Sequence, residues 1–249
     1  QSLTDQITIS GIQVKASVPS PIASPGNITR TSGNPGTQPV VGVTNDVTNF
    51  GSLSQSNTYT AVNATGNWNV AGSWSPAGVP ASCDNVVIPS GKIINTGALT
   101  NPTCKTLTVD GTLDVTLPLA VSSFNAGGDV LVNSGGTIYL EGSNGSNTFN
   151  VAGNITVNGF LWIGYNTPIV ANVTGNLINN TGGTTHLGDV GALISARLYI
   201  SGNAVINGGT VNSSYSPNHL YIYGDLTIAA GGELYLASGG GTTANIQNV

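Results

Sequence analysis

The stretch FNVAGNITVNGFLWI, residues 149–163, carries the pattern on which the fold depends. A Gly-Asn pair is followed by a short apolar strand, a Gly-containing turn and a second apolar run. The same order returns in ANVTGNLI, in LYISGNAVING and in LYIYGDLTIAAGGELYL. A unit that recurs at this spacing is typical of a solenoid, because one copy cannot bury its apolar face alone.

Seven copies align on the strand that comes after the corner. Their first strands begin at residues 86, 107, 130, 155, 177, 204 and 226. Each copy has room for three short strands and three turns, which is one coil of a parallel β-helix. We therefore predict an all-β fold, a right-handed parallel β-helix of about seven coils with roughly 22–25 residues per coil.

Three segments are expected along the chain. Residues 1–62 form a small β-rich N-terminal unit or cap, because 7–16 alternate apolar and polar side chains. Residues 63–82 form an entry segment in which Trp68 and Trp74 act as a cap, and 83–249 form the β-helix. Since 244–249 begin another coil, we expect the helix to continue beyond residue 249 or to associate end to end with another chain.

The composition excludes several classes of protein. Only 6% of the 249 residues are charged, and the net charge of −5 comes with no basic cluster. Nucleic acid is therefore not an expected partner. No apolar run has the length of a membrane span. No spacing of His, Cys and carboxylates matches a metal-ligand set, and we predict neither a metal nor a cofactor.

The two cysteines occupy equivalent places in adjacent copies. Cys83 and Cys104 each precede the first apolar residue of strand one by the same interval, at Val86 and Leu107. Stacked positions lie about 4.8 Å apart, within the Cα range of a disulfide. We predict a disulfide and, with it, an oxidising compartment. The alternative is a pair of buried thiols that happen to align.

Two further sets of side chains recur in fixed positions. The corner after Gly is expected to form a side-chain ladder, because Asn and Asp bond readily to nearby amides; it holds Asp129, Asn154, Asn176, Asn203 and Asp225. The outward positions of strands two and three hold aromatic side chains that are candidate contacts for glycans or a protein partner. These are Tyr139, Trp162, His186 and Tyr235 in strand two, and Tyr199 and Tyr221 in strand three. The alternative is that neighbouring aromatic side chains stack and stabilise the sheet.

The segment GNWNVAGSWSPAGVPASCDNVVIPSG resembles the entry to β-helical regions in large cell-surface proteins of Bacteroidota. The resemblance lies in the spacing of Trp68 and Trp74, the turn at 78–80, the strand start at 84–86 and the later copies of the repeat. It implies secretion, often through the type IX route, and a role in adhesion or gliding filaments.

Three functions remain from the sequence. A secreted structural or adhesive surface protein, with the β-helix as a rigid spacer or filament component, is the first. A carbohydrate-binding module that uses the aromatic column is the second, and a polysaccharide lyase or hydrolase is the third. For an enzyme the best candidates are His186, Asp189 and Arg197, but no convergent cluster of acid–base groups is evident, so we predict no catalytic residues. A regular outward row of Thr, as an ice-binding face would need, is absent from strand one.

Overall fold

The computed structural model describes residues 26–29, 49–53, 56–97, 101–117, 122–142, 147–189, 195–214, 217–236 and 243–248. The chain divides into two compact units, 1–57 and 58–249. In the first unit β1 (Gly26–Thr29) pairs antiparallel with β2 (Asn49–Leu53). The strand expected at 7–16 lies outside the described residues. The boundary between the units lies five residues before the predicted one, because residues 58–61 already belong to the second unit.

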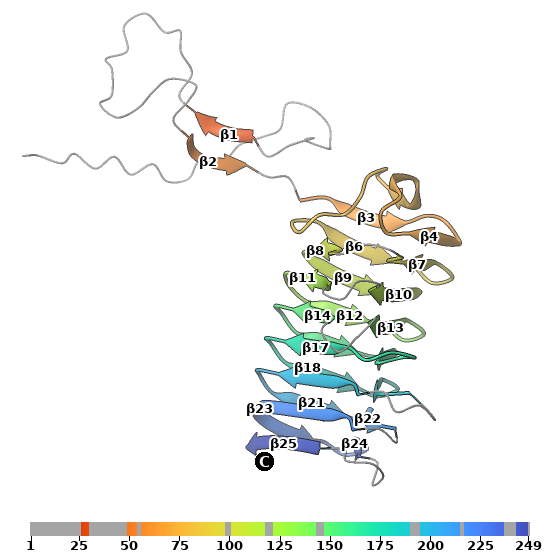
Figure 1. The fold of residues 1–249 in the computed structure, drawn as a ribbon, viewed down its shortest axis with the longest axis vertical. Helices are drawn as coiled ribbons and strands as arrows, with labels where there is room; N and C mark the ends of the chain where they lie inside the picture. The colour runs from red at the N-terminus through yellow and green to blue at the C-terminus, as the bar shows by residue number, and fades with distance from the viewer. Residues whose placement is uncertain are drawn as a thin grey trace, which may run out of the picture. The chain divides into compact units, whose positions relative to one another are not determined.

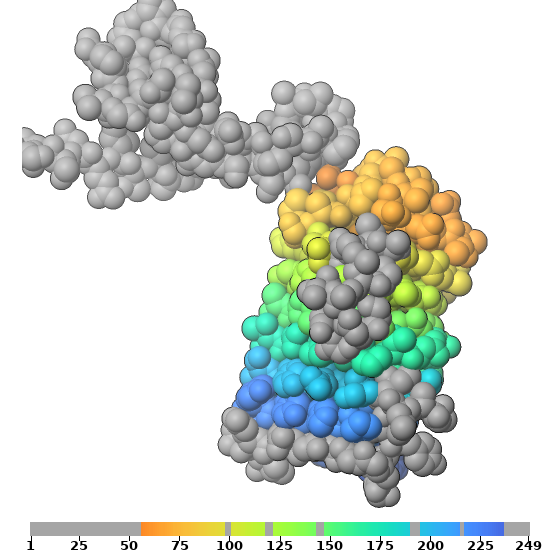
Figure 2. All heavy atoms as spheres, in the orientation of Figure 1, coloured from red at the N-terminus to blue at the C-terminus, as the bar shows by residue number. Residues whose placement is uncertain are grey.

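The second unit is a parallel β-helix of about seven turns, as the sequence predicts (Figure 1). Each coil after the first contributes one strand to each of three faces, and the coils follow one another as successive layers (Figure 2). Strands alternate between buried and half-buried side chains, because successive Cβ atoms of a strand point to opposite faces of the sheet.

Face one carries the first strand of each coil and runs in one register from Tyr59 through Val86 to Leu226. Its strands are β3 (Thr58–Ala61), β6 (Asn85–Ile88), β9 (Thr106–Val109), β12 (Val130–Val132), β15 (Ile155–Val157), β18 (Leu177–Asn180), β21 (Ala204–Asn207) and the second half of β23 (His219–Ile228).

Face two is an eight-stranded sheet built from the second strands. It consists of β4 (Thr65–Asn67), β7 (Ile93–Asn95), β10 (Thr112–Leu117), β13 (Thr137–Gly142), β16 (Phe160–Ile163), β19 (Thr184–Leu187), β22 (Thr210–Ser213) and β24 (Glu233–Tyr235).

Face three carries the third strands, and β23 joins it to face one because this strand runs through the corner without a break. It consists of β8 (Thr103–Cys104), β11 (Ser123–Ala126), β14 (Thr148–Val151), β17 (Val170–Val173), β20 (Arg197–Ile200), the first half of β23, and β25 (Thr243–Asn248).

The entry segment closes the first coil with aromatic side chains. A short 3₁₀ turn, η1 (Ala71–Ser73), leads into β5 (Trp74–Ser75), which pairs antiparallel with β3. The Trp68 side chain is 1% exposed and packs edge-on against Trp74 and against Phe124, with ring centroids 5.3 and 5.1 Å apart. The Trp74 indole N–H donates to the Trp68 carbonyl oxygen at 2.9 Å. The two tryptophans therefore belong to the core of the first coil.

One coil carries a polar pair inside the apolar core. Asn179 takes the inward position of Val157, and Thr185 takes that of Leu161. Both side chains are fully buried. The Thr185 hydroxyl donates to Asn179 Oδ1 at 2.8 Å, and Asn179 Nδ2 donates to the Thr210 carbonyl oxygen at 2.7 Å. Buried polar groups are costly mainly when they are unpaired. These bonds therefore offset the free-energy cost of burying the two polar side chains.

Candidate functional site

The corner residues singled out from the sequence form a ladder along the solenoid. The side-chain oxygen of each residue accepts the backbone N–H of the corner residue one coil later. The four distances are 2.8 Å from Asn154 to Asp129, 2.9 Å from Asn176 to Asn154, 2.7 Å from Asn203 to Asn176 and 2.9 Å from Asp225 to Asn203. The ladder satisfies backbone donors at a turn, which identifies these carboxylates and amides as structural groups.

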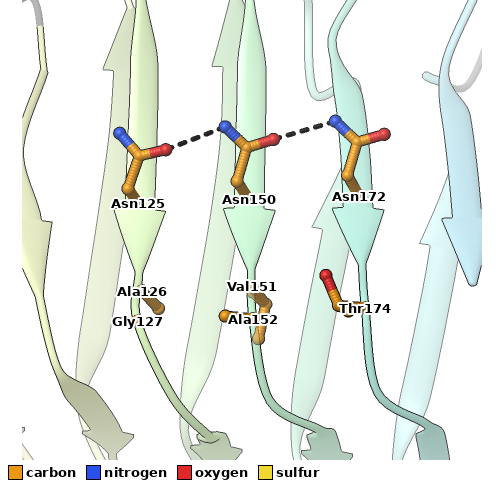
Figure 3. Close-up of a pocket in the computed structure, with 8 residues that line it drawn as sticks. All are labelled: Asn125, Ala126, Gly127, Asn150, Val151, Ala152, Asn172 and Thr174. Atoms are coloured by element: carbon orange, nitrogen blue, oxygen red, sulfur yellow. Dashed lines mark hydrogen bonds between the residues drawn. The ribbon is translucent and has the colours of Figure 1, made fainter. Parts of the chain in front are cut away.

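A second ladder runs along the outside of face three and borders a shallow groove (Figure 3). Asn150 Nδ2 donates to Asn125 Oδ1 and Asn172 Nδ2 donates to Asn150 Oδ1, each at 2.8 Å. The groove has a volume of about 400 Å³ and is lined on its other side by small residues of the corner, Gly127, Ala152 and Thr174. Because the Asn amides point at one another, they offer few free donors to a ligand in this groove.

The two tyrosines predicted as contacts on face three form a closed stack. The rings of Tyr199 and Tyr221 lie parallel, with an interplanar angle of 2° and centroids 4.5 Å apart. Each ring therefore covers one face of the other. This geometry matches the alternative that outward aromatic neighbours stabilise the sheet.

The aromatic side chains of face two gather around Trp162. We call this set the aromatic island and define it as Tyr139, Phe160, Trp162, Tyr165 and His186. The ring of Trp162 lies 4.8 Å from Tyr165, 4.9 Å from His186, 5.6 Å from Phe160 and 6.2 Å from Tyr139, between centroids. Tyr139 and Tyr165 are 4.9 Å apart. All five side chains are half-buried, and the indole N–H of Trp162 donates to the Gly188 carbonyl oxygen at 2.6 Å.

The island includes two residues that the sequence did not point to, Phe160 on β16 and Tyr165. Tyr165 lies in the turn after β16, where no period of two marks its side chain as outward. Tyr235, which the sequence placed in the same column, is 58% exposed. It pairs in register with Asn212, which separates it from His186.

Carboxylates flank the island. Glu141 extends from β13, and its Oε1 accepts a hydrogen bond from Asn166 Nδ2 at 2.8 Å. Burial raises the pKa of Glu141, and the nearby charges of Asp114 and Asp189 raise it further, although the bond from Asn166 opposes the shift. Asn166 has a φ of 62°, in the left-handed region that non-glycine residues seldom adopt. Its bond to Glu141 holds the turn that carries Tyr165.

His186 lies on β19, in register with Trp162 on the neighbouring strand. Its Nδ1 bonds to Asn212 Oδ1, and its Nε2 is buried with no hydrogen-bond partner. Burial lowers the pKa of His186, against the opposing effects of the Asn212 bond and the Asp189 charge. Arg197 lies apart from His186, because Arg197 is the first residue of β20 on face three while His186 lies on face two.

The predicted disulfide is wrong, since both cysteines are thiols in the structure. The register does place them one coil apart, because Asn85 pairs with Thr106. Cys104, however, is fully buried and burial raises its pKa to about 12. Cys83 is partly exposed, and its Sγ lies 3.8 Å from Asp84 Oδ1. The two side chains thus occupy different environments. Without the disulfide, the cysteines do not indicate an oxidising compartment.

Two further properties concern the described residues only. No group of three or more His, Cys, Asp or Glu side chains is placed to hold a metal ion in that part of the chain. None of the helical segments described there is long and apolar enough to cross a bilayer.

Comparison with known proteins does not assign the chain to a family. No protein family, no curated protein and no solved structure matches this chain. The functional argument therefore depends on the geometry of the solenoid and its outer faces.

Proposed function

We propose that the β-helix is a rigid spacer within a secreted, cell-surface structural or adhesive protein. The observation that supports this most is the continuous register of face one, which runs from Tyr59 to Leu226 with one strand per coil. Each coil adds about 4.8 Å of length. The number of coils in such a repeat sets the distance between the two ends of the solenoid.

The side-chain ladders support the same role. Hydrogen bonds tie the corner of each coil to the next one from Asp129 to Asp225. A second set ties Asn125, Asn150 and Asn172. Because these bonds run along the axis, they resist bending and separation of the coils.

The test is a change in coil number. Deletion of residues 107–129 removes one coil and joins Thr106 to Val130. Val130 pairs in register with Leu107, so it takes the position of Leu107 after the deletion. Phe149 then takes the position of Phe124 against Trp68, because the two phenylalanines share one position. In the cells that make the protein, a spacer variant should still reach the surface and support attachment, with reach reduced by one coil. Complete loss of attachment by a folded variant would contradict the proposal.

A further inference from the structure

Aromatic side chains are scarce in this protein, but several of them gather outside the core on face two. Aromatic residues make up 6% of the chain, yet four of them and a histidine meet around Trp162 in the aromatic island. Outward aromatic pairs stabilise a sheet, but this effect requires only register neighbours. Tyr165 is not a strand residue, and the turn that carries it is held over the sheet by a bond from Asn166 to Glu141. Stacking within the sheet does not explain that addition.

Hydrogen bonds within the protein fix two rings of the island before any partner binds. The Trp162 indole is oriented by its bond to Gly188, and His186 by its bond to Asn212. The strained backbone of Asn166 is found beside Tyr165, and strained residues tend to cluster at functional sites. Rigid side chains lose little conformational entropy on binding, which favours affinity.

The surroundings of the island define what it can bind. Asp114, Glu141 and Asp189 lie close enough to act on one another or on His186. The basic residues in the described part of the chain are Lys92, Lys105 and Arg197, and none lies on β10, β13, β16 or β19. The three carboxylates give the rim a negative charge, which disfavours uronates, sulfated glycans and nucleic acid.

We propose that the aromatic island is a binding site for a neutral glycan, with the aromatic rings packing against pyranose C–H faces and the rim carboxylates and amides accepting or donating hydrogen bonds to hydroxyl groups. Aromatic bodies that exclude water, with a few fixed polar groups beside them, are the usual composition of a small-molecule site. Successive strands are about 4.8 Å apart, a spacing close to the length of one sugar ring, so an extended chain can lie across β13, β16 and β19.

This site would add a ligand to the proposed spacer and does not depend on the spacer role. Residues 107–129 contribute only Asp114 to the rim and none of the island. Failure of the spacer proposal in the coil-deletion experiment therefore leaves the glycan proposal to be tested separately.

The test measures binding of soluble glucan, mannan and xylan, with polygalacturonate as the acidic comparison. Trp68 and Trp74 are 1% and 2% exposed, so a change in tryptophan emission reports on Trp162. We expect a neutral glycan to change the emission and to protect Trp162 from acrylamide quenching. Binding should weaken at least ten-fold in Tyr165→Ala and stay unchanged in Tyr221→Ala, a matched removal of a tyrosine from face three.

Four results would overturn the proposal. They are no binding of any neutral glycan, binding of polygalacturonate alone, loss of binding in Tyr221→Ala with retention in Tyr165→Ala, and binding with no change in Trp162 emission. The emission measurement uses the parent protein, so it remains decisive if Tyr165→Ala fails to fold.

Discussion

Asn176 Oδ1 accepts the backbone N–H of Asn203, one coil later, at 2.7 Å. Asn176 also donates from Nδ2 and from its own backbone to Asn154 Oδ1, at 3.1 and 2.9 Å. One side chain thus connects three successive coils. A corner residue in this β-helix supplies a hydrogen-bond partner that the backbone of the turn lacks.

The first prediction concerns that residue. Asn176→Ala should lower the free energy of unfolding by about 1–3 kcal/mol, because it leaves the Asn203 N–H without its acceptor. Asn176→Asp keeps the acceptor and should cost less. Chemical denaturation of both variants checks the order, and equal losses would show that the Asn203 bond contributes little.

The second prediction concerns the buried polar pair. Thr185→Val alone should destabilise the protein by about 1–3 kcal/mol, since it removes the hydroxyl that donates to Asn179. Adding Asn179→Val should recover much of that loss, because Val157 and Ile206 fill the same position in the neighbouring coils. A double-mutant cycle measures the coupling. Additive losses would mean that the two side chains do not depend on each other.

The third prediction concerns the thiols. Cys83 should react with an alkylating reagent in the native protein, whereas Cys104 should react only after unfolding, because burial raises its pKa to about 12 and denies access. Mass spectrometry of the alkylated protein, prepared without reductant, counts the labels. A mass lower by two hydrogen atoms, with no label, would restore the disulfide and contradict the structure.

The fourth prediction concerns pH. The pKa of His186 lies below its ordinary value of 6.5, since burial favours the neutral form in the folded protein. His186 therefore contributes stability that is fully present above pH 6.5 and is lost as the pH falls through the lower folded pKa. In His186→Gln the acid side of the stability curve should be flatter. An unchanged curve would show that a group other than His186 causes the loss of stability at acid pH.

Much of the architecture could be predicted from the sequence, because register in a solenoid follows from the repeat itself. The alignment placed Trp162 between Tyr139 and His186, and the strands pair in that order. The sequence prediction did not recognise the first coil and divided it between the N-terminal unit and the entry segment. The reason is that Gly66 occupies the inward position that Ile94 fills in the next coil, so no apolar residue marks the strand. A Cβ at Gly66 would lie 2.8 Å from Ser73 Oγ, so an apolar side chain cannot mark that strand.

The candidate site was less predictable than the fold. The period of two identified outward side chains on strands but not Tyr165, which lies in a turn. It also could not distinguish the stack of Tyr199 and Tyr221 from the island around Trp162. In the sequence, both sets are aromatic residues at outward positions of successive copies. The disulfide was mistaken for a related reason, because equal positions in the repeat did not give the two cysteines equal burial.

The most direct test of the central claim measures length per coil. Spin labels at positions 87 and 227, in a background without Cys83 and Cys104, mark two outward positions on face one. These are six strands apart through Thr108, Leu131, Thr156, Ile178 and Val205. Their separation should be about 29 Å and should fall by about 4.8 Å when residues 107–129 are deleted. An unchanged distance, or loss of a defined distance in a variant that still folds, would contradict the account in which each repeat adds one coil of length.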